Sequence, residues 1–284
     1  MSKDKNPQNL KFNKNEVECM KIIVTGPRGK MGRLVIKSCC DNEKIQLVAA
    51  VAPKGREYIG QDVGLVANIG QNIGCKVVDD LDSVIDKCNC IIDFTDSQIS
   101  MDVFEKALKS KKAVVCGSTG FSEEQLNRIN EISKEIPVVL AGNTSMVVNL
   151  MYKLVELAAK TIGDMSDIEI IEMHDRYKKD APSGTSLEIG EVLANTFNKE
   201  LKDLAQFGRC GKGGREDGKI AYHSLRAGDI SSTHTVMFGL MGERLEITHH
   251  AHNWECFANG GCKAALYLQN KKPGMYSMKD VLGL

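Results

Sequence analysis

Short apolar runs alternate with amphipathic segments along the first half of the chain. The runs are rich in Ile and Val and are bounded by polar or Gly-containing turns, which predicts buried strands. These strands are expected at residues 21–25, 45–51, 90–95, 112–121 and 137–145. Helices are expected at residues 33–39 and 98–109 and from Ser122 onward, and residues 77–86 predict a short strand and a helix. This alternation is typical of the α/β class with a doubly wound parallel sheet.

The pattern changes in the second half. An apolar helix is expected at residues 146–160, a strand from Ile168, and a further helix that includes Leu187 to Leu193. A glycine-rich, charged connection at Phe207–Lys219 then precedes three strands and one more helix. These are expected at residues 220–230, 234–240, 244–250 and 257–268. We therefore predict a second, α+β domain with an open, partly antiparallel sheet. The polar residues 1–20 are expected to form a disordered extension.

A glycine-rich turn lies between the first predicted strand and its helix. Gly26 to Gly32 reads G-P-R-G-K-M-G, with a G-x-x-G-x-x-G spacing. Glycines at such a turn let the backbone approach a pyrophosphate, which the helix N-terminus can hold. Structural turns use the same spacing, but the position between two strands favours a dinucleotide-binding unit.

The end of the second predicted strand indicates which dinucleotide is preferred. An acid at this position binds the ribose 2′-hydroxyl, whereas a base accommodates a 2′-phosphate. The chain continues here with Ala52 and Pro53, then Lys54 and Arg56. We therefore expect NADPH to be favoured, with NADH as the alternative, although lysines are also common on protein surfaces.

A second stretch with candidate catalytic and substrate-binding residues runs from Ile168 to Leu193. His174, Arg176, Lys178 and Lys179 follow the predicted strand, and the sequence D-A-P-S-G-T then leads into a helix. Three residues at the start of that helix offer free N–H groups or hydroxyls to a carboxylate: Ser183, Gly184 and Thr185. By residue type alone, an ordinary strand–loop–helix with solvated charges would look the same.

Composition excludes several other classes. The 284 residues favour two domains, and the 37 basic and 37 acidic residues balance, so neither nucleic acid nor a membrane is an expected partner. Ten cysteines form no C-x-x-C pair, which favours a reduced, cytoplasmic protein. His249, His250 and His252 lack thiols or carboxylates at ligand spacing, so we predict no metal site. His223 and His234 are interpreted as sheet residues and Arg244 as an ion-pair partner.

Six segments together resemble one enzyme family. They are residues 26–32, 92–95 (I-D-F-T), 115–121 (V-C-G-S-T-G-F), 172–185 (E-M-H-D-R-Y-K-K-D-A-P-S-G-T), 226–229 (R-A-G-D) and 242–249 (G-E-R-L-E-I-T-H). Their order and the K-x-D-A-P-S-G-T element are similar to the 4-hydroxy-tetrahydrodipicolinate reductase (dihydrodipicolinate reductase) family. The resemblance covers about residues 21–284.

The resemblance implies the domain organisation and the reaction. A Rossmann domain would comprise residues 21–145 and 255–284, and residues 146–254 would form a substrate domain that assembles a homotetramer. The implied reaction is NAD(P)H-dependent reduction of a cyclic, unsaturated dicarboxylate in lysine and diaminopimelate biosynthesis. His174 would be the general acid, and Lys178 a second essential donor and carboxylate partner.

The resemblance also implies binding residues. The substrate-binding set is Asp175, Lys178, Ser183, Gly184, Thr185 and His249. The cofactor-binding set is Gly26, Arg28, Gly29, Lys30, Met31, Gly32, Lys54, Phe94, Thr95, Gly117, Thr119, Asn143 and Ser145. Within that second set, Asn143 and Ser145 would also link the two domains.

Four departures from the family pattern bear on substrate and cofactor. Asp175 replaces a second histidine, and Ala52 and Pro53 replace an acid and a base. Thr144 and Val147 replace an aromatic residue and a glycine, and Trp254 occupies an arginine position. Two alternatives therefore remain beside the family's own reaction. One is a paralogue that reduces another cyclic imine or enamine, and the other is a non-catalytic NAD(P)H-binding regulator.

Overall fold

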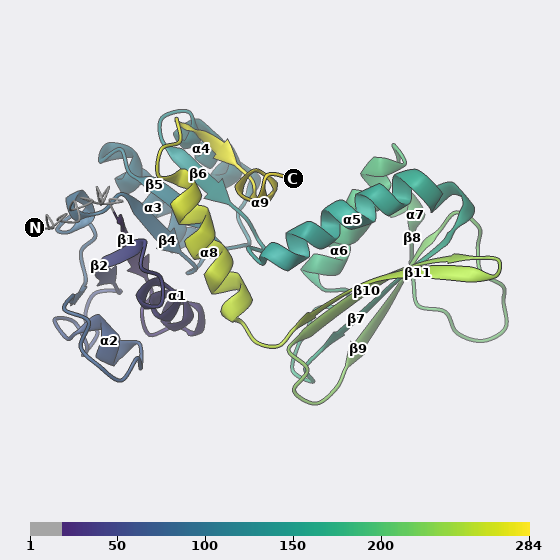
Figure 1. Ribbon diagram of the computed structural model, residues 1–284, viewed down its shortest axis with the longest axis horizontal. Helices are drawn as coiled ribbons and strands as arrows, with labels where there is room; N and C mark the ends of the chain where they lie inside the picture. Colours follow the sequence, from purple (N-terminus) through teal and green to yellow (C-terminus); the bar gives the residue numbers. More distant parts are fainter. Residues whose placement is uncertain (1–18) are drawn as a thin grey trace, which may run out of the picture.

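The computed structural model describes residues 19–284, which form two lobes around two separate sheets (Figure 1). The first sheet has seven parallel strands in the order β12-β6-β5-β4-β1-β2-β3, so the predicted parallel sheet is confirmed. Its strands are β1 (Met20–Thr25), β2 (Ile45–Val51), β3 (Val77–Val78), β4 (Cys90–Asp93), β5 (Ala113–Cys116), β6 (Pro137–Leu140) and β12 (Gly274–Tyr276). The extension predicted at residues 1–20 lies outside the described residues, except for Cys19 and Met20.

Helices cover both faces of this sheet. They are α1 (Lys30–Cys40), α2 (Val63–Val66), α3 (Ser97–Lys109), α4 (Glu123–Ser133), α8 (Glu255–Leu268) and α9 (Met278–Leu282). Successive side chains of a strand point to opposite faces, so each strand contributes to two cores. Ile22 of β1 packs in the core that contains Ile36 of α1, whereas Ile23 packs in the core that contains Phe104 of α3. The doubly wound architecture follows from this two-sided burial.

The second sheet is mixed, with the order β11-β10-β7-β9-β8. Its elements are α5 (Met146–Ile162), β7 (Asp167–His174), α6 (Gly184–Thr196), α7 (Leu201–Leu204), β8 (Ala205–Phe207), β9 (Ile220–Arg226), β10 (Ser232–Leu240) and β11 (Glu243–Ala251). Strand β10 runs antiparallel to β7 and β11, and β9 runs parallel to β7 and β8. Helices α5 and α6 lie against one face only (Figure 1).

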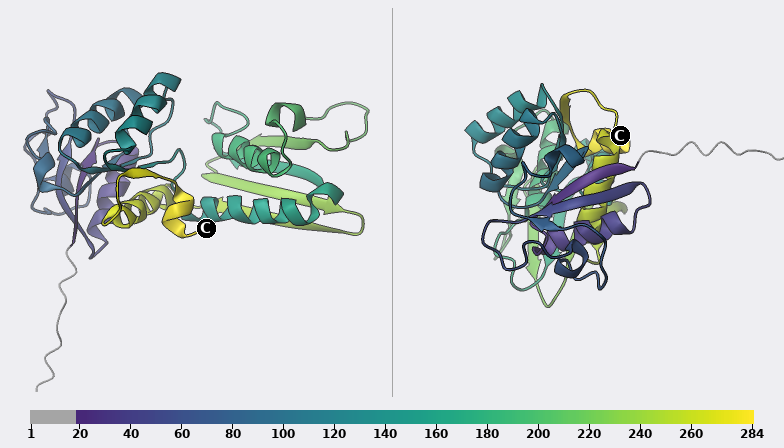
Figure 2. Two further views of the ribbon diagram at one scale, coloured as in Figure 1. Left: turned by 90° about the horizontal axis from the view of Figure 1, so that it is seen from above. Right: turned by 90° about the vertical axis from the view of Figure 1, so that its left-hand side faces the viewer.

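Two connections join the lobes side by side. Helix α5 enters the second lobe, and the chain returns from β11 into α8, after which β12 pairs with β6 (Figure 2). The hydroxyl of Thr144 donates to the carbonyl of Phe257 at 2.7 Å. A Cβ atom at Gly260 would lie 1.7 Å from the Thr144 carbonyl oxygen, so only glycine permits this approach. The domain boundaries at residues 145/146 and 254/255 stay a prediction.

Several predicted elements need correction. The helix expected within residues 77–86 is only a 3₁₀ turn at Ile85–Lys87. Asp80 explains this locally, because its side chain and carbonyl accept hydrogen bonds from Asp82 N and Ser83 Oγ and shape a bend instead. Helix α1 begins at Lys30 rather than at residue 33, and the strands expected at 112–121 and 137–145 end at Cys116 and Leu140. Short elements α2, β8 and β12 were not predicted.

In residues 19–284, no helix combines the length and the apolar character that crossing a membrane requires.

Candidate active site

A cavity of about 760 Å³ lies where the strand ends of the first sheet face β7 and α6 of the second lobe. From the first lobe and its connections it is lined by residues that include Met31, Phe94, Gly117, Thr119, Asn143, Trp254 and Phe257. From the second lobe it is lined by His174, Asp175, Lys178, Ser183, Gly184 and Thr185, among others. The cavity thus brings together most of the predicted substrate-binding residues and part of the predicted cofactor-binding set.

His174 reaches this cavity because of its position in β7. Ile168 and Ile170 of the same strand point into the core beneath α5 and α6, and Glu172 and His174 continue that row toward the cavity. The Nδ1 atom of His174 lies 2.5 Å from Oε2 of Glu172. Strand β7 therefore places the imidazole of His174 and its carboxylate partner Glu172 next to each other at the cavity.

Glu172 is only 1% exposed and is held from three sides. Both terminal nitrogens of Arg226 donate to its carboxylate at 2.8 Å, and the backbone N–H of Ser183 donates at 3.3 Å. Burial alone would raise the pKa of Glu172, but the hydrogen bonds from Arg226 and its other partners keep that pKa below its ordinary value. The carboxylate is therefore ionised, and it fixes the proton of neutral His174 on Nδ1.

The electrostatic surroundings of His174 favour its neutral form. Burial lowers the pKa of His174, Glu172 acts in the opposite direction, and the cations of Lys178 and Arg226 lower it further. With Nδ1 directed at Glu172, Nε2 is the nitrogen that gains or loses a proton. The ring contacts that of His234 edge-on, with centroids 5.2 Å apart.

Lys178 supplies a cation at the same cavity. Its ammonium lies 2.9 Å from the carboxylate of Asp180, and the lysine side chain is 24% exposed. The ion pair lowers the pKa of Asp180. Asp175 also lines the cavity, and its side chain accepts a hydrogen bond from the backbone N–H of Tyr177 at 2.8 Å.

The N-terminus of α6 forms the remaining wall. Ser183 caps the helix and accepts from the backbone N–H of Ser186, so the N–H groups of Gly184 and Thr185 are left at the first turn. The hydroxyl of Thr185 accepts a hydrogen bond from Asn143 at 3.1 Å, which joins the two lobes at the site. Such a helix end attracts a carboxylate.

His234 and His249 complete the buried row behind the site. Nε2 of His234 lies 3.0 Å from the Ser183 hydroxyl, and burial lowers the pKa of His234 to about 3. His249 pairs with His234 across β10 and β11, with ring centroids 6.5 Å apart. His249 is buried and does not line the cavity, unlike the other predicted substrate-binding residues. These roles of Glu172, Arg226 and His234 were not predicted from the sequence, because only strand pairing brings these residues together.

The glycine turn has the shape that a dinucleotide requires. Gly26 has a φ of +64°, and a Cβ atom at Gly32 would lie 2.0 Å from the Gly26 carbonyl oxygen. Gly29 caps α1 without a side chain, so the first N–H groups of the helix are open to a pyrophosphate. The residues present therefore fit a dinucleotide cofactor.

The other predicted cofactor residues are divided between this turn, the main cavity and the start of α5. Gly26, Lys54 and Thr95 line a second cavity of about 600 Å³, together with Asp79, which β3 places beside the end of β2. Arg28 pairs with Glu57, Lys30 lies over the ring of Trp254, and Ser145 caps α5. No acid directly follows β2 in the sequence, and Asp79 was not predicted at this position because β3 is distant in sequence from β2.

One further buried carboxylate organises the strand ends. Asp93, at the end of β4, is 1% exposed and accepts hydrogen bonds from Thr25, Thr95, Ser100 and Ser118. These hydroxyls come from β1, from the loops after β4 and β5, and from α3. Asp93 thereby ties the glycine turn to the loops that line the main cavity.

A Rossmann-type sheet with an open glycine turn, facing a histidine, a lysine and a helix N-terminus across a cleft, defines a nicotinamide-dependent oxidoreductase. Two family models match in tandem, described as "Dihydrodipicolinate reductase, N-terminus" over residues 20–144 and "Dihydrodipicolinate reductase, C-terminus" over residues 147–282. The chain belongs to the dihydrodipicolinate reductase family.

Individual relatives agree with this assignment. The 4-hydroxy-tetrahydrodipicolinate reductase of Hahella chejuensis is 45% identical over 265 residues, which are 93% of this chain and 99% of that protein. The structure of dipicolinate-bound dihydrodipicolinate reductase from Paenisporosarcina sp. TG-14 matches with a TM-score of 0.73 and 26% identity over 91% of this chain and 97% of that one. An amine dehydrogenase from Mycobacterium smegmatis shares the fold, with a TM-score of 0.63 and 11% identity over 91% and 95% of the two chains.

Proposed function

We propose that the chain reduces 4-hydroxy-tetrahydrodipicolinate, via dihydrodipicolinate, to tetrahydrodipicolinate with NAD(P)H, a step of lysine and diaminopimelate biosynthesis. Family membership and the dipicolinate bound to a relative support the substrate class. The observation that carries the proposal is the cavity itself. His174, Lys178 and the N-terminus of α6 meet there, opposite the loops that follow β4, β5 and β6.

The two carboxylates of the substrate require two binding positions with positive electrostatic potential. The N–H groups of Gly184 and Thr185 with the Thr185 hydroxyl form one, and the Lys178 ammonium forms the other. Lys178 must exchange its partner Asp180 for the substrate, which is feasible because their ion pair is partly exposed. The position of Lys178 also lets its charge stabilise electron density that the ring gains in the transition state.

Nicotinamide bound in the cleft would supply the hydride. His174 supplies the proton from Nε2, and Glu172 orients the ring through Nδ1. Before substrate enters, the lowered pKa of His174 keeps the imidazole neutral near pH 7. A dianionic substrate raises the pKa of a neighbouring histidine, so binding itself favours uptake of the proton that the reaction consumes.

Both cofactors are expected to be used, NADPH at least as well as NADH. Lys54 can attract a 2′-phosphate, whereas Asp79 in the same cavity can accept hydrogen bonds from the 2′-hydroxyl of NADH. The advantage of NADPH should shrink at high salt, because the charge of an exposed lysine is screened. The measurement is the ratio of kcat/KM for the two cofactors at two salt concentrations, and a clear preference for NADH at low salt would contradict the assignment of Lys54.

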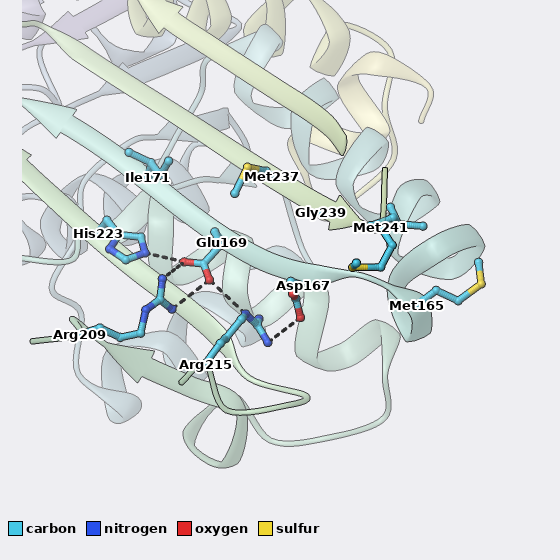
Figure 3. A pocket seen from close by; sticks show the side chains of 11 residues that line it. Met165, Asp167, Glu169, Ile171, Arg209, Arg215, His223, Met237, Gly239 and Met241 are labelled. Atoms are coloured by element: carbon cyan, nitrogen blue, oxygen red, sulfur yellow. Dashed lines mark hydrogen bonds and ion pairs between the residues drawn. The ribbon is translucent and has the colours of Figure 1, made fainter. Parts of the chain in front are cut away.

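The outer face of the second sheet supports a homotetramer. Ile171 and Met237 lie on the face that α5 and α6 leave uncovered, and Met241, directly after the end of β10, is fully exposed (Figure 3). In the same place Glu169 binds Arg209, Arg215 and His223 and so anchors the loop of residues 208–219 on the sheet. We place the subunit interface on this face, because a partly apolar sheet surface of this kind is buried in stable oligomers.

The test is turnover of the pathway's own substrate, generated in place by a coupled synthase, with NADPH and with NADH. Rapid oxidation of either cofactor that depends on the synthase product supports the proposal. No turnover by a folded protein that binds NADPH would contradict it.

Asp175 and Trp254, which depart from the family pattern and line the cavity, favour one second candidate, reduction of another cyclic imine or enamine. Turnover of such a compound in place of the pathway substrate would identify it. A non-catalytic regulator would need neither the His174–Glu172 pair nor Lys178.

A further inference from the structure

Trp254, the single tryptophan of the chain, lies at the main cavity. It is the N-cap residue of α8, where the chain passes from β11 back to the first lobe. The residue is 40% exposed, although a large aromatic side chain usually gains by full burial. Its exposed surface faces a cavity rather than a core, so packing alone does not account for its position.

A cation from the glycine turn lies over the indole. Nζ of Lys30 is 3.5 Å from the centroid of the Trp254 ring, which is the geometry of a cation–π contact. Lys30 is the first residue of α1 and directly follows Gly29 of the turn. The ring of Phe257 contacts the indole edge-on, with ring centroids 5.7 Å apart. The indole therefore touches both the end of the turn and the wall of the cavity.

Helices α1 and α8 are joined without this contact. Lys37 of α1 pairs with Glu255 of α8 at 2.6 Å, and Ser38 donates to Asn259 at 2.7 Å. The buried thiols of Cys39 and Cys262 meet between the same helices. Since these contacts already hold the two helices together, the Trp254–Lys30 contact is not needed for that purpose. It can instead have a role in ligand binding at the cavity.

We propose that Trp254 is a cofactor-positioning residue, whose indole holds the Lys30 ammonium beside the pyrophosphate and flanks the nicotinamide half of the bound dinucleotide. This rests on the proposed function, because it requires a nicotinamide dinucleotide at the glycine turn. The nicotinamide half is the part that must reach the cavity of His174, which Trp254 also lines. A flat, electron-poor ring stacks well on an indole, and a phosphate attracts the ammonium beside it.

The first test is the affinity for NADPH, measured by calorimetry. Trp254→Leu should raise the Kd about fivefold, the size of effect expected for one cation–π or stacking contact at a partly exposed site. Trp254→Phe keeps an aromatic face and should raise it only about twofold. The matched control is Tyr267→Leu, since Nζ of Lys271, which follows the end of α8, lies 4.1 Å from the centroid of the Tyr267 ring and neither residue lines the cavity. The Kd of this control should not change.

A double-mutant cycle with Lys30→Met tests whether Trp254 acts through the lysine. If the indole positions that ammonium, Trp254→Leu should have a smaller effect in the Lys30→Met background than in the wild type. Equal and additive effects would contradict that part of the proposal, because a merely structural role of Trp254 would not depend on Lys30.

Fluorescence provides a readout that a structural role would not change. Because the chain has one tryptophan, all indole emission comes from Trp254. NADP⁺ absorbs little of this emission, so quenching by NADP⁺ reports contact between the nicotinamide and the indole. We expect saturating NADP⁺ to remove most of the emission, and Trp254→Phe, which should fold even if the leucine variant does not, to abolish the signal altogether.

The outcomes separate this inference from the proposed function. Wild-type protein that binds NADPH and turns over substrate, with unquenched emission and a normal Kd in Trp254→Leu and Trp254→Phe, would overturn the role of Trp254 alone. Wild-type protein that binds neither NADPH nor NADH would overturn both proposals. Quenching together with a weakened Kd in the variants and a non-additive cycle would establish Trp254 as part of the cofactor site.

Discussion

At the scale of single residues, Glu172 determines how the candidate acid behaves. Its carboxylate is buried, yet it remains ionised because Arg226 and the backbone of Ser183 stabilise the negative charge. It then holds Nδ1 of His174 at 2.5 Å and partly offsets the effect of burial on the histidine pKa. Loss of the charge at Glu172 should therefore change the acidity of His174 without removing the imidazole.

Glu172→Gln should lower the pKa of His174 further, because the carboxylate is what raises it against burial. A general acid with a lower pKa is protonated only at lower pH, so the limb of the kcat/KM profile that reports His174 should move to lower pH. We also expect kcat/KM near neutral pH to fall about 10- to 100-fold, as is usual when a partner that orients a catalytic group is lost. The measurement is the full pH–rate profile.

The matched control is Glu169→Gln, which neutralises the corresponding buried carboxylate on the outer face of the same strand. Its partners are Arg209, Arg215 and His223, none of which lines the main cavity. An unchanged profile in Glu172→Gln, or the same shift in both variants, would contradict the role assigned to Glu172.

At the scale of elements, the turn between β1 and α1 shows how a local pattern fixes a binding geometry. The chain must fold back so closely that the Cβ position of Gly32 lies on the Gly26 carbonyl. Any side chain at Gly32 would therefore push the helix N-terminus away from the proposed pyrophosphate site. The need for glycine at position 32 therefore comes from the backbone path of the turn, and not from contact with any one side chain.

Gly32→Val should weaken NADPH binding at least tenfold, or about 1.4 kcal/mol, through this displacement. Calorimetry measures the change, and thermal denaturation checks that the variant is folded. Gly213→Val is the control, since Gly213 lies in the exposed loop after β8 with open space at its Cβ position. If the affinity for NADPH is the same in both variants, the turn does not hold the pyrophosphate.

Periodicity predicted the elements well wherever burial on both faces or an amphipathic stripe left a clear signal. Examples are the strand at residues 45–51, the strand predicted at 90–95 and observed at 90–93, and the helix capped by Ser122. The prediction failed where local side-chain hydrogen bonds decide the backbone, as at Asp80, and where a strand of two or three residues depends on a distant partner, as in β12. Such a strand carries too little pattern of its own to be recognised.

The residues of the candidate site likewise fall into two groups, those that could be predicted from the sequence and those that could not. His174, Lys178 and the residues from Ser183 to Thr185 lie on one continuous segment, so sequence alone could group them. Arg226 and His234 reach the site only because β9 and β10 flank β7. Asp79 likewise reaches the cavity that Gly26, Lys54 and Thr95 line only because β3 pairs with β2. These contacts depend on sheet order, which no local pattern encodes.

At the scale of the whole molecule, the two lobes share one cavity. Helices α5 and α6 cover only one face of the second sheet (Figure 1). The inner face of the second sheet supplies the core and, at its end, the Glu172–His174 pair. The outer face presents Ile171 and Met237 beside the anchored loop of residues 208–219. One sheet can thus serve the reaction on one side and assembly on the other.

If the outer face forms the tetramer, Met237→Lys should dissociate it, because the substitution places a charge in a desolvated contact. Light scattering should give the mass of four chains for the wild type and a smaller assembly for the variant. Met275→Lys, which changes an exposed methionine of β12 in the first lobe, is the control and should remain tetrameric. A wild-type mass of one chain would contradict the proposed assembly.

The proposed reaction requires that His174 and Lys178 act on substrate in the cavity between the lobes. Single-turnover stopped-flow measurement of cofactor oxidation tests this directly, in Lys178→Met, His174→Gln and the control Lys179→Met, whose side chain is exposed and does not line the cavity. We predict that hydride transfer slows about 10²-fold or more in the first two variants, the range for a lost acid or electrostatic group, while NADPH affinity stays normal and the control matches the wild type. Near-wild-type hydride transfer in both Lys178→Met and His174→Gln would contradict the proposed site.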